Sequence, residues 1–102
     1  MIFQVTHQHT NETCPGVDSE IGDGVGQWWQ ALKSNPDVKL LAGYVSPMDH
    51  TFHITVEADD YAPVARAMGG LNGIGTGHTT PVITLDQAFP MADEGAFRLP
   101  GQ

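Results

Sequence analysis

The sequence has very little positive charge. Four of its 102 residues are lysine or arginine and twelve are aspartate or glutamate, which gives a formal net charge of −8 with neutral histidines. Such an acidic surface repels phosphate backbones and anionic lipid headgroups, so nucleic acid and membrane surfaces are excluded as expected partners. The sequence also lacks any apolar run approaching the roughly 20 residues that span a bilayer.

Cysteine is almost absent as well. Cys14 is the single cysteine, so the chain cannot form a disulfide with itself. The first ten residues contain neither a basic leader nor a long apolar segment. These features predict a cytoplasmic protein. A chain of this length corresponds to one domain with a single modest core.

Hydrophobic periodicity predicts six regular elements in residues 1–86. Alternation and β-forming residues predict strands over 2–9, 38–45, 51–58 and 78–86. Apolar residues at helical spacing predict one helix from Asp18 to about Asn35 and another after Asp59 and Asp60. The glycine-rich stretch 69–77 indicates a flexible loop, and Pro81 favours an edge position for the last strand. Residues 87–102 are expected to form a C-terminal tail or dimer arm.

The order strand, helix, strand, strand, helix, strand is typical of the ferredoxin-like βαββαβ arrangement, an α+β fold with a four-stranded antiparallel sheet in the order 4-1-3-2. With this order and the stretch Thr51-Phe52-His53-Ile54-Thr55-Val56-Glu57-Ala58-Asp59-Asp60, residues 1–86 resemble the small dimeric α/β barrel superfamily. That superfamily includes muconolactone isomerases, cofactor-free antibiotic-biosynthesis monooxygenases and a nickel-binding actinobacterial group. The resemblance implies a homodimer whose two open sheet faces enclose a barrel, and it carries over no catalytic residue.

All five histidines fall at the ends of predicted strands, and the topology gathers those ends at one rim of the sheet: His7, His9, His50, His53 and His78. The loop after the first strand adds Glu12 and Cys14 at the same rim. Imidazole ligands suit zinc, copper, nickel or ferrous iron. The pattern therefore predicts a transition-metal site built on His7 and His9. Single histidines at strand ends are also common as ordinary surface or hydrogen-bonding residues.

Side-chain parity limits which histidines act together, because successive strand residues point to opposite faces. His7 and His9 share one face. If Phe52, Ile54 and Val56 pack under the helices, His53 points away from them, while His50 keeps the parity of the helix side. If Ile83 and Leu85 belong to the core, His78 lies on the open face. Two arrangements remain: His7 and His9 with His53 inside the barrel, or His7, His9 and His50 on the helix side.

Other residues offer chemistry of a different kind. Cys14 could act as a nucleophile activated by a histidine, and Glu57 could act as a base beside His53. Trp28 and Trp29 are adjacent on a helix, so one of them could reach a pocket mouth or a dimer interface. The leading hypothesis is a metal-binding protein that performs metal-assisted chemistry on a small molecule. The alternatives are a cofactor-free isomerase or monooxygenase acting on a small aromatic compound in the barrel cavity, and an interaction module without chemistry.

Overall fold

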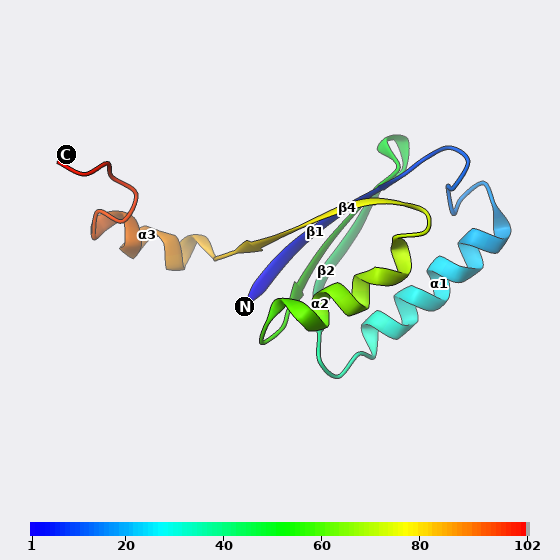
Figure 1. Cartoon of the computed structure of the whole chain (residues 1–102), viewed down its shortest axis with the longest axis horizontal. Helices are drawn as coiled ribbons and strands as arrows, with labels where there is room; N and C mark the ends of the chain where they lie inside the picture. Colours follow the sequence, from blue (N-terminus) through cyan, green and yellow to red (C-terminus); the bar gives the residue numbers. More distant parts are fainter. Residues whose placement is uncertain (102) are drawn as a thin grey trace.

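A computed structural model describes residues 1–101 of the chain as a four-stranded antiparallel sheet with two helices on one face (Figure 1). The strands are β1 (Ile2–His9), β2 (Lys39–Ser46), β3 (Thr51–Glu57) and β4 (Gly75–Val82). The α-helices are α1 (Ser19–Lys33), α2 (Tyr61–Met68) and α3 (Leu85–Asp93), and two short 3-10 helices are η1 (Pro47–Asp49) and η2 (Gly69–Leu71). The sheet order is β2-β3-β1-β4. The predicted ferredoxin-like α+β fold is confirmed.

Aspartate side chains begin both helices that cover the sheet. The Asp18 carboxylate accepts hydrogen bonds from the backbone N–H groups of Glu20 and Ile21 at 3.0 and 3.1 Å. Asp60 accepts one from the N–H of Ala62 at 2.9 Å. These N–H groups have no partner within their helix, so each cap contributes about 1 kcal/mol to stability.

The core lies between the helices and one face of the sheet. Phe3 and Val5 of β1 and Ile54 and Val56 of β3 point to this side and are all buried. They pack with Leu32 of α1 and with two residues of α2, Val64 and Met68. The opposite face carries mainly polar side chains, and the Thr55 hydroxyl donates to the Gln4 side-chain oxygen at 2.6 Å. One face of the sheet is thus apolar and covered, and the other is polar and open.

Strand β4 begins three residues earlier than predicted and ends four residues earlier. Part of the expected flexible loop is therefore strand, with His9 opposite Gly75 and His7 opposite Gly77. A Cβ atom at Gly75 would collide with the Gln8 carbonyl oxygen, so a glycine lets β4 approach β1 closely. Because the strand stops at Val82, Ile83 lies beyond the sheet and is half exposed rather than in the core. Pro81 does lie on an edge strand, as predicted.

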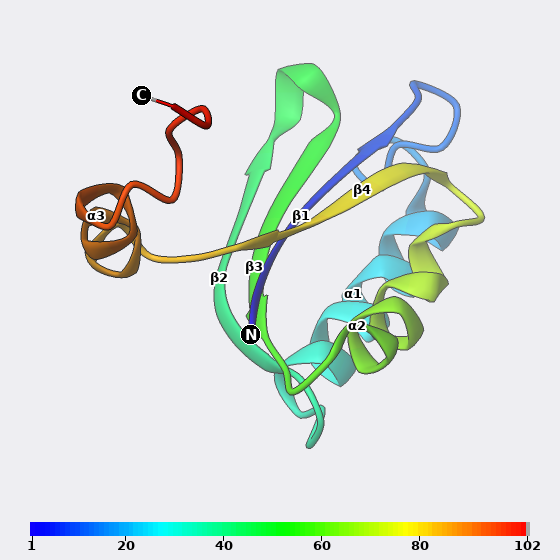
Figure 2. The same ribbon diagram turned by 60° about the vertical axis from the view of Figure 1, so that its left-hand side comes forward.

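The C-terminal segment contains a helix that the sequence reasoning did not predict. A capping box begins α3: the Thr84 hydroxyl accepts from the Gln87 N–H at 3.1 Å, and the Gln87 side-chain oxygen accepts from the Thr84 N–H at 3.0 Å. The Thr-x-x-Gln spacing was a readable signal for it. In both ribbon views α3 projects away from the sheet and from α1 and α2 (Figures 1 and 2). Within residues 1–101, no helix is long and apolar enough to cross a membrane.

Candidate metal centre

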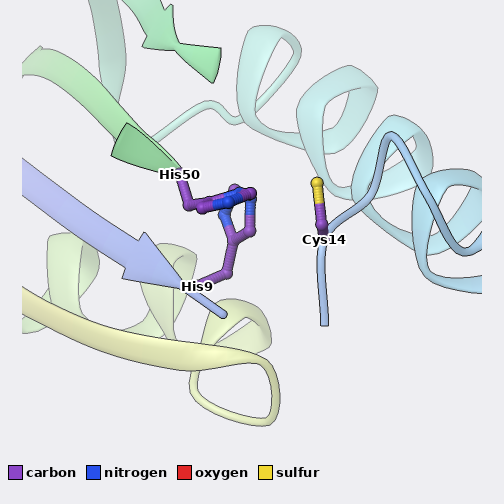
Figure 3. A group of neighbouring side chains, drawn as sticks. All are labelled: His9, Cys14 and His50. Atoms are coloured by element: carbon purple, nitrogen blue, oxygen red, sulfur yellow. The ribbon is translucent and has the colours of Figure 1, made fainter. Parts of the chain in front are cut away.

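His9, Cys14 and His50 come together at the rim where β1 ends and β3 begins (Figure 3). Each offers one potential ligand atom, and these three atoms all lie within 4.8 Å of one another. His9 is the last residue of β1, Cys14 lies in the loop before α1, and His50 lies between η1 and β3. Two imidazole nitrogens and one thiol sulfur, from three separate segments, are therefore close neighbours.

The two imidazoles of this group are held close together. Nε2 of His9 and Nδ1 of His50 are 3.3 Å apart, and the rings meet nearly edge to face at 71°. The backbone N–H of His9 also donates to the His50 carbonyl at 2.9 Å. His50 has φ 52°, in the left-handed region that few residues other than glycine adopt. Its position is therefore set by the tight turn that follows η1.

The loop carrying Cys14 is tied to its surroundings on both sides. The Cys14 carbonyl accepts hydrogen bonds from the N–H groups of Val17 and Asp18 at 3.1 and 3.0 Å. The Thr13 hydroxyl donates to the Ile74 carbonyl at 2.7 Å, which fastens the loop to the segment just before β4. The thiol itself is free and half buried. These contacts hold the sulfur at the rim.

His9 is buried in a way that favours its neutral form. Its side chain is 6% exposed and packs against Phe52 with ring centroids 5.3 Å apart. Burial lowers the pKa of His9 below its ordinary value of 6.5, and the neighbouring His50 and His7 lower it further. A neutral imidazole has a lone pair available for a metal ion at neutral pH.

His7 lies beside this group, on the same face of β1, and is only 3% exposed. Its Nε2 is 2.9 Å from the Leu71 carbonyl oxygen. A carbonyl can only accept, so Nε2 carries a proton, and in the neutral ring Nδ1 of His7 is then an acceptor. Nδ1 of His7 and Nδ1 of His9 are both buried, and neither has a hydrogen-bond partner among residues 1–101.

His53 and His78 lie on the other face of the sheet. Both are opposite Thr6, whose side chain has the parity of the open face. Nε2 of His53 is 3.2 Å from the Ser46 hydroxyl, and His78 is exposed. Side-chain parity allowed two arrangements of the histidines. In the structure, His7, His9 and His50 lie on the helix side of the sheet, as in the second arrangement.

Two acidic candidates lie away from the group. Glu12 is exposed in the loop before Cys14. Glu57 is exposed at the last position of β3, the end of that strand remote from His50. Cys14, expected at this rim both as a further donor and as a candidate nucleophile, is the third member of the histidine group.

A separate apolar cavity of about 220 Å³ lies between α1 and strands β2 and β3. Its lining includes Val25, Trp28, Trp29, Gly43, Phe52 and Ile54. A Cβ at Gly43 would lie 2.5 Å from the Trp29 ring, so the glycine makes room for that indole. Nε1 of Trp28 donates to the Ala67 carbonyl at 2.8 Å, which fixes the other ring. Both tryptophans therefore line a pocket on the helix side, and sequence reasoning missed Gly43.

No protein-family model matches the chain, and no curated protein matches its sequence. A solved structure titled "Crystal structure analysis of SCO4226 from Streptomyces coelicolor A3(2)" is similar to it, with a TM-score of 0.52 and 16% sequence identity. The likeness covers 82% of this chain and 100% of that chain. At this identity the likeness shows the fold alone. It agrees with the ferredoxin-like architecture and assigns no family.

Proposed function

We propose that this protein binds a transition metal ion through His9, Cys14 and His50. The observation that carries the proposal is the convergence of two imidazole nitrogens and a thiol sulfur within 4.8 Å. The 3.3 Å between Nε2 of His9 and Nδ1 of His50 also matches the spacing of two nitrogens bound to one metal ion. Two nitrogens bound to zinc at about 2.05 Å with a tetrahedral angle lie about 3.3 Å apart.

The donor set narrows the class of metal. Imidazole and thiolate ligands suit zinc, nickel, copper and iron, whereas magnesium and calcium require oxygen ligands. Three protein donors leave the fourth position of a tetrahedral ion to a small-molecule ligand. Metal storage and metal-assisted chemistry on a small molecule are both compatible with such a site.

The first test is metal titration of the untagged, metal-free protein with zinc, nickel, copper and ferrous iron. We expect one ion per chain for the wild type and at least about 10-fold weaker binding for Cys14→Ser. His78→Ala is the matched control, because it removes an exposed imidazole from the opposite face. The absence of stoichiometric binding by the wild type, or equal losses in both variants, would refute the proposal.

We also propose that the protein is a homodimer. In this dimer α3 and the rest of the segment 87–102 contact a second copy. Leu85 and Phe89 on α3 are 72% and 62% exposed. A helix of nine residues containing Pro90 is too short to be stable alone in water, where about 12–15 residues are needed. Sedimentation velocity tests this: the full chain should be dimeric, and a chain ending at Val82 should dissociate more readily. A monomeric full chain would contradict it.

The cavity supports a second candidate function, the binding of a small aromatic compound without a metal. Its volume of about 220 Å³ exceeds the roughly 150 Å³ of an engineered apolar cavity that binds benzene. Trp28 and Trp29 supply flat apolar walls. The cavity lies under α1, however, so the ligand would bind on the helix side and not in a barrel between two sheets.

A further inference from the structure

Three histidines on the helix side follow one another from the core to the rim. His7 is nearest to the Leu71 carbonyl, His9 comes next on the same face of β1, and His50 is nearest to His9. These contacts involve three of the six ring nitrogens: Nε2 of His7, Nε2 of His9 and Nδ1 of His50. Which atom donates and which accepts in each hydrogen bond on this path from the core to the rim depends on which ring nitrogen carries the proton.

The Leu71 carbonyl defines the inner end of the path. It requires a proton on Nε2 of His7, and in the neutral ring Nδ1 is then an acceptor. The His7 ring stacks on Phe52 with an interplanar angle of 18°. Gly75 of β4 leaves room for this ring, because a Cβ there would lie 2.8 Å from the Cε1 atom of His7.

The next pair of atoms is Nδ1 of His7 and Nδ1 of His9, both buried and without a partner among residues 1–101. A buried polar atom left unpaired costs roughly 1–3 kcal/mol, so native proteins nearly always satisfy it. His7 can only accept at this atom, whereas His9 can donate if its proton is on Nδ1. The two residues are two positions apart and point to the same side.

We propose that His7 is a positioning residue: its Nδ1 accepts the Nδ1–H of His9 across one bridging water, and so keeps the Nε2 lone pair of His9 free for the metal ion. The inference rests on the proposed metal site. His9 then accepts at Nε2 from the Nδ1–H of His50, which accounts for the 3.3 Å contact. The path becomes a consistently oriented chain of N–H groups that ends at the Leu71 carbonyl.

The proton balance of metal binding follows from this chain. His9 and His50 would hold the ion through Nε2 and Nδ1, and Cys14 would hold it as a thiolate, so the thiol proton would go to solvent. The His50 ring is partly exposed, so on giving up the proton on Nδ1 it could take one up at Nε2 from solvent and stay neutral. The hydrogen bonds from His9 to His7 and from His7 to Leu71 are retained, as is common for the outer nitrogen of a metal-binding histidine.

Two amide substitutions test the roles of the two ring nitrogens of His7 separately. In His7→Asn the side-chain oxygen lies near the former Nδ1 position and can still accept from His9. In His7→Gln the amide nitrogen lies near the former Nε2 position and can still donate to Leu71. A positioning role predicts zinc affinity within about 3-fold of wild type for H7N and about 10–100-fold weaker for H7Q. A purely structural role of the Leu71 bond predicts the reverse order.

A second measurement needs no metal. Nitrogen-15 NMR of histidine side chains in the metal-free wild type should show His9 protonated at Nδ1 and His7 at Nε2. Finding His9 protonated at Nε2, or H7Q with wild-type zinc affinity, would overturn the inference. If the wild type binds no metal but shows these tautomers, and H7Q shifts the His9 proton to Nε2, the proposed function fails and the positioning of His9 by His7 stands.

Discussion

The two faces of the sheet hold histidines in very different surroundings, and His78 lies within β4 and not at the rim. On the helix side, His7 and His9 are buried, and His9 lies against His50 and near Cys14. On the open side, His53 contacts a serine hydroxyl and His78 is exposed. Convergence on one rim is therefore not enough to form a metal site. The side of the sheet decides which histidines have partners, because parity separates neighbours that the topology brings together.

The difference between the two faces is tested most strongly by removing one imidazole from each face. His9→Ala removes a ligand of the proposed site, so we expect zinc affinity to fall by at least about 100-fold. His53→Ala should change it less than about 2-fold, since its partner is Ser46 on the other face. Isothermal titration calorimetry of the two variants measures both values. Similar losses would mean that the faces are not functionally distinct.

The sequence allowed the element order, both aspartate caps and the shared face of His7 and His9 to be predicted, because each depends on local periodicity or capping chemistry. It did not decide which face they share, since Phe3 and Val5 could equally line a barrel. The sequence placed Cys14 at the rim, but which histidines it joins could not be derived. Its sulfur lies in an irregular loop, and His50 lies in a left-handed turn where strand parity does not apply.

The helix side should also be less tolerant of added volume. At Gly75 a Cβ would meet the backbone of Gln8 and the His7 ring, so Gly75→Ala should lower the free energy of unfolding by about 1–3 kcal/mol. Gly73→Ala is the control, because nothing lies within 4 Å of its Cβ position. Urea denaturation compares them. A Gly75→Ala protein as stable as the control would show that close β1 to β4 packing does not constrain His7.

Filling the apolar cavity should separate the two candidate functions. Val25→Phe places a ring in the cavity and should abolish binding of benzofuran, a small apolar aromatic probe, while leaving zinc affinity unchanged. Val17→Phe is the control, since that residue is 79% exposed. Saturation-transfer NMR detects the probe. Benzofuran binding that survives in Val25→Phe would place the ligand elsewhere.

The smallest expected effect concerns pH. The pKa of His9 is lower in the folded protein than its ordinary value of 6.5, so the unfolded state binds more protons as the pH falls. The stability contributed by neutral His9 is complete above about pH 6.5 and is lost as the pH falls through the lower folded value. Unfolding of metal-free protein should therefore become less sensitive to pH in His9→Gln than in the wild type. Parallel slopes in the two proteins would rule out this role for His9.

The central claim is tested most directly by X-ray absorption spectroscopy at the zinc edge, on wild-type protein loaded with one equivalent of zinc. The account predicts one sulfur at about 2.3 Å and two imidazole nitrogens at about 2.0–2.1 Å, with the sulfur contribution lost in Cys14→Ser. A coordination shell without sulfur in the wild type, or one left unchanged by Cys14→Ser, would contradict it.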